Sequence, residues 1–448
     1  MKESQLFTPV KIGPLTLRNR TIRAAAFEGM CSGNAPTDLL YDYHRSVARG
    51  GIGMTTLAYA SVTRDGLSFP HQLWLRPEVV PGLRRITDAI HSEGAAASIQ
   101  IGHCGNMSHR AICGCRPVSA SSGVNIYSPT LVRGLRRDEI TEKAKAFGDA
   151  VRLAREAGFD AVEVHAGHGY LISQFLSPYT NRRRDEYGGS LGNRMRFMRM
   201  CMDEVMRAAG DDMAVVVKTN MRDGFRGGME IGECLEVARE LERCGAHALV
   251  LSGGFVSRAP MYVMRGSMPI RTLTHYMTQW WLKLGVGMFG RMMIPSVPFR
   301  EAYFLDDARH FREAVKLPLV YVGGLVSRTK IDEVLDAGFD CVAMARALSL
   351  IPGITIAHTK MTWGFLARAL CALVCGPVMG LVFGFVEDIL GFILQPTGDF
   401  FPGYTLSTMA GVLVYALCFY RARITVLRIV LANLVVNLLV NALMGSLW

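Results

Sequence analysis

The sequence predicts an α/β barrel of eight parallel strands, followed by a partial all-α transmembrane region. First, short apolar runs alternate with stretches of helical period throughout the first 348 residues. Second, three of these helices end in a glycine directly before the next apolar run, namely Gly158, Gly245 and Gly338. A glycine there supplies the left-handed C-cap that stops a helix before a strand. Third, the composition changes sharply after residue 351.

The eight predicted strands span residues 22–26, 53–59, 96–101, 161–165, 214–219, 248–251, 319–322 and 341–345. Residues 139–156 and 231–244 are clear examples of the helices between them. This alternation favours a TIM (β/α)8 barrel. A doubly wound open sheet is the alternative, but no Gly-rich dinucleotide-binding motif follows the first strand. Long insertions at 103–138 and 253–301 are expected over the C-terminal face, where barrel active sites lie.

The last 97 residues carry only eight charged side chains, whereas the first 351 carry the other 79. We therefore predict a barrel domain at 1–350, a linker at 351–362, and membrane helices at 363–448, about 363–375, 378–394, 405–420 and 424–447. Arg421 and Arg423 mark their loop as cytoplasmic by the positive-inside rule. The N-terminus has no secretory apolar segment. The barrel is expected in the cytoplasm, where its cysteines would stay reduced.

Charge and cysteine content exclude several classes of function. The net charge is +11, but the basic residues are scattered, so we expect no nucleic-acid partner. The 11 cysteines form no paired C-x2-C motifs, which argues against a zinc or iron–sulfur site. The most closely spaced pair is Cys113-x-Cys115, which we interpret as a loop thiol pair without function. A reducing compartment fits best.

The segment 160–197 carries the most chemistry. The predicted strand 161–165 ends at His165, and His168 and Tyr170 follow closely. At the end of a barrel strand, two imidazoles can hydrogen-bond one carbonyl or nitro oxygen, and a phenol can deliver a proton to the adjacent carbon. A metal site is a weaker interpretation because no third ligand lies close in sequence. A purely structural histidine pair also stays open.

These residues belong to a longer pattern that resembles the old yellow enzyme family of FMN-dependent ene-reductases. The pattern includes Asn181…Arg184-Asp185…Tyr187-Gly188-Gly189-Ser190, Leu6-Phe7-Thr8-Pro9 and Val322-Gly323-Gly324, and covers residues about 5–348. The resemblance implies a TIM barrel holding FMN, reduced by NADH or NADPH, that passes hydride to an electron-poor alkene. It implies that His165 and His168 bind the substrate oxygen and that Tyr170 donates the proton.

The same resemblance implies a set of flavin ligands. Gln100 would meet the pyrimidine edge of the ring with its amide, and Lys218 would place a cation beside flavin N1 and O2. A plain strand-end lysine is the alternative for Lys218. The remaining implied ligands lie near the ring or at the barrel phosphate site: Ala25, Ala26, Gly323, Gly324, Ala345 and Arg346.

The sequence also departs from the family pattern. Phe27 stands where the family usually has Thr or Cys, and Tyr59 where it has Gly or Ala, so Tyr59 could crowd the flavin. Ala345 replaces a glycine before Arg346. The pattern stops at residue 348, which predicts a barrel that lacks its final helix.

Residues about 356–448 resemble instead the folate-type substrate-binding component of energy-coupling-factor vitamin transporters. The shared motifs include Gly376-Pro377, Pro396-Thr397-Gly398 and Phe401-Pro402-Gly403-Tyr404. The resemblance implies a lipid bilayer and a transporter energising module as partners. The first and last helices of that family are missing, so the tail is either a partial membrane region or the product of an artefactual junction.

Three functional hypotheses follow. The first is an FMN-dependent NAD(P)H oxidoreductase that passes hydride to a small-molecule electron acceptor of the α,β-unsaturated carbonyl type. The second is a membrane component of a vitamin transporter, with the function in the tail. The third is a barrel that holds flavin without catalysis.

Overall fold

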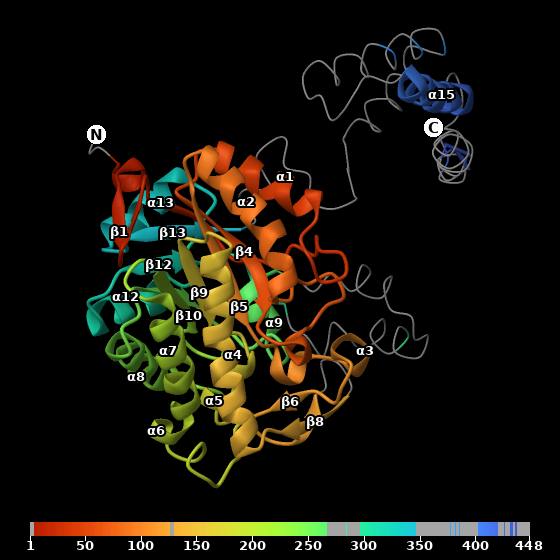
Figure 1. The fold of residues 1–448 in the computed structure, drawn as a ribbon. Helices are drawn as coiled ribbons and strands as arrows, with labels where there is room; N and C mark the ends of the chain where they lie inside the picture. The colour runs from red at the N-terminus through yellow and green to blue at the C-terminus, as the bar shows by residue number, and fades with distance from the viewer. Residues whose placement is uncertain are drawn as a thin grey trace. The chain divides into compact units, whose positions relative to one another are not determined.

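The computed structural model describes residues 4–125, 130–266, 296–345 and the backbone of 402–419, together with single positions elsewhere. The chain divides into two compact units, Met1–Leu348 and Ser349–Trp448. We describe each unit by itself (Figure 1).

Unit 1 is built on a closed barrel of parallel strands. The prediction of a β/α barrel is confirmed, and the doubly wound alternative is wrong. The first strand ends three residues earlier than predicted, so residues 24–26 lie beyond the ladder at the C-terminal mouth. In chain order the strands are β3 (Thr21–Arg23), β4 (Met54–Ser61), β5 (Ala96–Gly102), β9 (Ala161–His165), β10 (Ala214–Asn220), β11 (Ala248–Ser252), β12 (Leu319–Val322) and β13 (Cys341–Met344).

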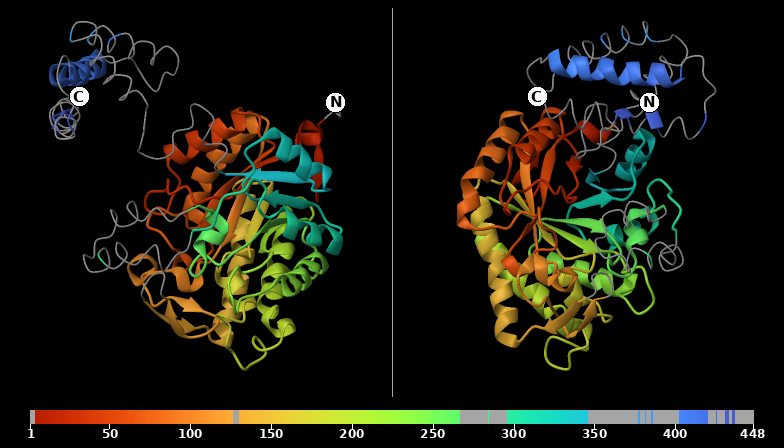
Figure 2. Two further views of the ribbon diagram at one scale, coloured as in Figure 1. Left: turned by 180° about the vertical axis from the view of Figure 1, so that it is seen from behind. Right: turned by 90° about the vertical axis from the view of Figure 1, so that its right-hand side faces the viewer.

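Helices surround the barrel on the outside (Figures 1 and 2). The three predicted C-cap glycines, Gly158, Gly245 and Gly338, have φ values of 82°, 87° and 93°. The left-handed caps are therefore confirmed. The predicted absence of a helix after β13 falls on positions outside the described residues. The main covering helices are α1 (Asp38–Arg49), α2 (Val80–Ser92), α4 (Arg137–Glu156), α7 (Arg196–Ala209), α8 (Ile231–Arg243), α12 (Leu305–Ala314) and α13 (Arg328–Asp336).

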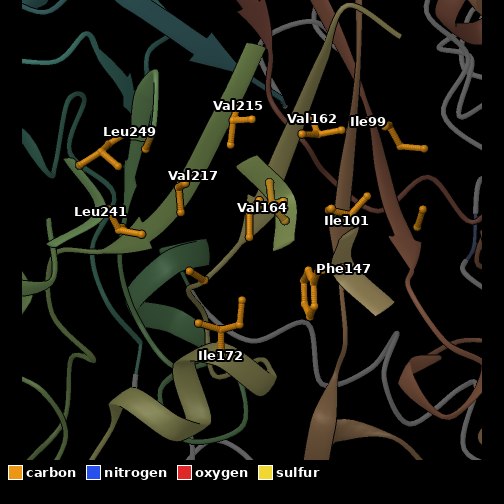
Figure 3. Close-up of a cluster of buried hydrophobic side chains, with 14 of the residues drawn as sticks. Ile99, Ile101, Phe147, Val162, Val164, Ile172, Val215, Val217, Leu241 and Leu249 are labelled. Atoms are coloured by element: carbon orange, nitrogen blue, oxygen red, sulfur yellow. The ribbon is translucent and has the colours of Figure 1, made fainter. Parts of the chain in front are cut away.

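Side chains alternate between the two faces of each strand. Figure 3 shows Val162 and Val164 of β9 in the apolar cluster that also contains Phe147 of α4 and Ile172 of α5 (Leu171–Leu176). Ala161, in contrast, belongs to a second cluster inside the barrel. This alternation also directs Glu163 and His165 inward.

The N-terminal end of the barrel interior is apolar. There, Ile12 and Leu17 of the β1–β2 hairpin (Val10–Ile12 and Leu15–Leu17) pack against inward residues such as Ala214 and Ala248. The hairpin thereby closes the bottom of the barrel. The buried polar residues of the strands lie at the opposite, C-terminal end, which is where barrel active sites form.

Insertions follow two strands at that end, as predicted. The first carries η4 (Gly105–Met107), the short helix α3 (Arg110–Cys113) and a three-stranded sheet of β6 (Val118–Ser119), β7 (Gly123–Asn125) and β8 (Thr130–Gly134). The second includes α9 (Pro260–Met264), and most of its remainder lies outside the described residues.

In unit 2, the structure describes one helix at length, α15 (Pro402–Phe419), which overlaps the predicted helix at 405–420. Val412, Tyr415 and Ala416 of α15 pack with Ala432 and Val436. The other predicted helices, 363–375, 378–394 and 424–447, lie outside the described residues apart from single positions. No helix in the described part of the chain is both long enough and apolar enough to cross a membrane.

Candidate active site

Polar side chains from neighbouring strands converge inside the C-terminal mouth of the barrel. They are Gln100 of β5, Glu163 and His165 of β9, Lys218 of β10 and Ser252 of β11, and all are at most 4 % exposed. Charged groups buried to this degree must be paired, because an isolated buried charge is strongly unfavourable.

Glu163 is the centre of this group. Its Oε1 lies 2.8 Å from Lys218 Nζ and accepts a hydrogen bond of 2.6 Å from Gln100 Nε2. Lys218 Nζ also donates to the carbonyl oxygen of Ala25 at 3.4 Å. The structure therefore brings together three of the predicted flavin ligands, Ala25, Gln100 and Lys218.

Glu163 is not among the site residues predicted from sequence, although the sequence carries a signal for it. Glu163 stands between Val162 and Val164, which face the outer apolar layer, and two positions before His165. A charged residue on the inward side of so apolar a strand marks a paired or functional group.

His165 is a neutral hydrogen-bond donor. Its Nδ1 accepts from the Gly167 amide at 3.4 Å, which leaves the ring proton on Nε2. Burial holds the pKa of His165 well below its usual range, and electrostatic interactions with His168 and Lys218 lower it further. The imidazole is therefore uncharged at neutral pH.

His168 is fixed by two polar residues from adjacent strands, neither of which was predicted from sequence. Its amide donates to Asn220 Oδ1 at 2.9 Å, which holds the residue at φ +58°, and its Nε2 lies 2.7 Å from Ser252 Oγ. Burial and the charge of Lys218 lower the pKa of His168 to about 3. Both imidazoles are thus neutral, and their rings lie edge to face with centroids 5.1 Å apart.

Tyr170 completes the predicted trio. Its ring stacks on His165 with centroids 4.3 Å apart and meets Tyr59 edge-on at 5.1 Å. The phenol is partly exposed, at the residue that precedes α5. The structure therefore places all three predicted catalytic side chains at one site, while their roles stay predictions.

Tyr59 lines the same mouth. It is 3 % exposed, packs with Cys104 and Met107, and its hydroxyl lies 2.6 Å from Ser68 Oγ. Phe27 stays 42 % exposed and stacks on Phe69 with centroids 4.5 Å apart. Tyr59 thus has its own packing and hydrogen-bond partners beside the catalytic trio.

The predicted phosphate site is described only in part. Gly324 follows β12 with φ +66°, and a Cβ there would lie 2.7 Å from the ring of Tyr303. A Cβ on Gly323 would lie 2.8 Å from the Tyr321 hydroxyl. Ala345 is partly buried after β13, and Arg346 lies outside the described residues. Both glycines are therefore required by close packing, while the arginine of the predicted site stays a prediction.

The donor set of the mouth fits a flavin. The Gln100 amide offers both donor and acceptor atoms to a pyrimidine edge. The Lys218 ammonium group can donate a charge-assisted hydrogen bond to a carbonyl oxygen or to an anionic N1 of the ring. Across the described residues, no group of three or more His, Cys, Asp or Glu side chains could hold a metal ion.

Comparisons with known proteins agree with this chemistry. Residues 5–279 match the NADH:flavin oxidoreductase / NADH oxidase family. The 4,4'-dithiodibutanoate disulfide reductase of Rhodococcus erythropolis is 40% identical over 344 residues, which cover 77% of this chain and 85% of that protein. The metal reductase of Desulforamulus reducens is 36% identical over 56% of this chain and 38% of that protein. The solved old yellow enzyme homologue from Zymomonas mobilis matches with a TM-score of 0.61 and 24% identity, over 76% of this chain and 88% of that one, which shows the shared fold.

Proposed function

Because the chain belongs to the NADH:flavin oxidoreductase / NADH oxidase family and is thus a flavin-dependent NAD(P)H oxidoreductase, we propose that its acceptor is an α,β-unsaturated carbonyl compound. The observation that carries the proposal is the neutral pair His165 and His168 with Tyr170 stacked beside it. FMN, when bound, supplies hydride chemistry between the nicotinamide and the acceptor.

Chain residues hold the cofactor in this proposal. Gln100 and Lys218 bind the pyrimidine side of the ring, and Ala25 and Ala26 leave room beside it because their side chains are small. The remaining predicted ligands bind the phosphate: Gly323, Gly324, Ala345 and Arg346. A glycine-rich turn after the seventh strand with an arginine after the eighth is typical of phosphate sites in such barrels.

The two imidazoles bind the acceptor oxygen. His165 donates from Nε2, since its Nδ1 is already engaged with the Gly167 amide. Neutral donors stabilise the negative charge that develops on a carbonyl oxygen as its conjugated alkene is reduced. Ser252, 2.7 Å from His168 Nε2, helps to hold the second ring in position.

Tyr170 delivers the proton to the alkene carbon next to the carbonyl. The stacking of its ring on His165 places the phenol beside the group that binds the oxygen. Tyr59, packed edge-on against Tyr170, holds that ring and helps to exclude water.

A second acceptor class is favoured by the relative from Rhodococcus erythropolis, which is named for the reduction of a disulfide. Hydride attack on one sulfur of a disulfide breaks the S–S bond and gives one thiol and one thiolate. This reaction needs the same reduced cofactor but no proton donor to carbon.

The test uses the full-length, FMN-loaded protein under anaerobic conditions. NADH or NADPH should bleach the flavin, and 2-cyclohexen-1-one should restore its colour and yield the saturated ketone. If 4,4'-dithiodibutanoate restores the flavin colour and 2-cyclohexen-1-one does not, the acceptor belongs to the disulfide class instead. If the flavin bleaches and no acceptor other than oxygen restores it, the enone proposal is wrong.

For the tail, the boundaries 1–350, 351–362 and 363–448 and a membrane-bound chain with the barrel on the cytoplasmic side remain proposals. One observation supports them: α15 is an 18-residue helix with no charged side chain. Full-length protein should then sediment with membranes after an alkaline wash. Folate binding by that fraction tests the transporter resemblance, and release of the chain by alkali contradicts the membrane assignment.

A further inference from the structure

Two thiols face each other on the insertion that follows β5. Cys113 ends α3 and is buried, whereas Cys115 is exposed. Gly114 between them is left-handed, with φ 77° and ψ −5°, and turns the chain back on itself. The two sulfur atoms lie 3.9 Å apart, and Cys113 Sγ also donates to the carbonyl oxygen of Cys115 at 3.2 Å. The two sulfur atoms are therefore in direct contact with each other.

This pair borders the candidate active site but has no role in the proposed reaction. The insertion begins with Cys104 and Met107, which pack in one cluster with Tyr59 and Tyr170. The helix α3 follows directly and contacts η2 (Arg64–Gly66). The dithiol thus lies on the segment that forms one wall of the barrel mouth.

The surroundings of the pair are basic. Residues 109–116 include Arg110 and Arg116, both exposed, and no acidic residue. The guanidinium of Arg64 lies 3.9 Å from the position of a Cβ on Gly114. Asp65, an acid that acts on the Cys115 thiol, is already paired with Lys143 at 2.6 Å. A small reactant with carboxylates would therefore be attracted here.

We propose that Cys113 and Cys115 form a redox-active dithiol that exchanges with small anionic disulfides. The Cys115 thiolate attacks one sulfur of the disulfide, forms a mixed disulfide and releases one thiolate, which takes up a proton from water. Cys113 then loses its proton to water, attacks the Cys115 sulfur and releases the second thiol. The dithiol is oxidised by two electrons to an internal disulfide, and the reactant is reduced to two thiols.

The environment of Cys115 sets the conditions for a test. Burial, the neighbouring Cys113 thiol and Asp65 raise its pKa to about 11, whereas Lys143 opposes the rise. Arg133 also lies within electrostatic range of the thiol, and its guanidinium is paired with Glu139 at 2.6 Å. Because the thiolate is the attacking species, the exchange is measured at about pH 9, where more thiolate is present than at neutral pH.

The experiment uses the full chain, reduced and then freed of reductant, without NADH or NADPH, so flavin turnover does not enter the result. It is incubated with glutathione disulfide, which is anionic, with neutral hydroxyethyl disulfide, or with cationic cystamine. Peptide mass spectrometry should show a loss of about 2 Da on the peptide that contains Cys113 and Cys115. The rate should fall several-fold from the anionic to the neutral to the cationic reagent.

Three variants separate the roles of the residues. Cys113→Ser should trap a mixed disulfide on Cys115, and Cys115→Ser should abolish the exchange at this segment. Arg110→Gln should slow the reaction with glutathione disulfide and leave that with hydroxyethyl disulfide unchanged. Cys244→Ser, at a half-exposed thiol elsewhere, is the matched control and should react like the parent.

Two results overturn the dithiol exchange itself. One is that Cys113 and Cys115 stay reduced although the disulfide reagent has already modified Cys244 in the same sample, and the circular dichroism shows that the protein is folded. The other is a lack of any adduct on Cys115 in Cys113→Ser. Equal rates with the three reagents would overturn the preference for anionic disulfides.

Discussion

Lys218 Nζ lies 2.8 Å from Glu163 Oε1 inside the barrel mouth, where the two side chains are only 3% and 4% exposed. Gln100 donates to the same carboxylate oxygen, so one acidic group orients both predicted pyrimidine ligands. The carboxylate also offsets the positive charge of Lys218 inside the barrel. Glu163 is therefore a positioning residue that sets both geometry and local charge.

The first prediction concerns this charge balance. Glu163→Gln keeps a hydrogen-bonding side chain but removes the negative charge, so the site becomes more positive and favours the reduced, anionic flavin. The two-electron midpoint potential of bound FMN should rise by roughly 30 mV or more, since 30 mV corresponds to about 1.4 kcal/mol. Lys218→Met should shift it in the opposite direction. Equal potentials in the parent and in both variants, measured by dye-coupled reduction, would contradict this account.

Tyr170→Phe tests the proton donor. The substitution keeps the ring stacked on His165 and removes only the hydroxyl, so flavin reduction by NADPH should hardly change. Reoxidation by 2-cyclohexen-1-one should slow by about 10²-fold, the usual contribution of general acid catalysis. Stopped-flow measurement of the two half-reactions gives both rates. Slowing of both by the same factor would mean that Tyr170 acts only through packing.

The neutral histidines predict a pH dependence of stability. The pKa of His168 is about 3 in the folded chain, below the ordinary value of 6.5, so the unfolded state takes up a proton first as pH falls. The contribution of neutral His168 to the free energy of unfolding is fully present above about pH 6.5 and declines from there toward pH 3. His168→Asn should flatten this decline in urea titrations of unit 1 unfolding between pH 7 and pH 4.5. A slope unchanged by the substitution would show that His168 is not the responsible group.

Gly158 provides a test of the fold. Its φ of 82° is left-handed, and a Cβ there would lie 3.1 Å from Thr87 Oγ1. Gly158→Ala should therefore lower the free energy of unfolding by about 1 to 2 kcal/mol. Gly232→Ala in α8 is the control, because φ there is not left-handed and no atom lies within 4 Å of the added Cβ. Equal stabilities of the two variants in denaturant titrations would contradict the C-cap assignment.

The barrel could be predicted from sequence because its signals are local. Strand alternation and left-handed caps such as Gly158 depend on a few consecutive residues. Only the part of the site that lies in one short motif could be predicted, because His165, His168 and Tyr170 stand within six consecutive residues.

The partners of these residues could not be predicted in the same way. Glu163 meets Lys218 across 55 residues, and Ser252 meets His168 across 84, so both contacts depend on the register between strands. The alternation of residues in β9 indicates only that Glu163 points into the barrel, and it does not indicate which residue Glu163 contacts. The contacts of Tyr59 also depend on the fold, because its hydroxyl lies 2.6 Å from Ser68 Oγ and its ring meets that of Tyr170 edge-on.

The most direct test of the central claim is the position of hydrogen isotope in the product. FMN-loaded protein is given 2-cyclohexen-1-one with NADPH deuterated at the transferred position of C4, in ordinary water. A single-turnover measurement limits exchange of the transferred deuterium with water while it is on the flavin. The expected product is cyclohexanone with deuterium on the β-carbon and hydrogen from solvent on the α-carbon. Cyclohexanone without deuterium on the β-carbon, or no cyclohexanone from protein whose flavin is reduced, would contradict it.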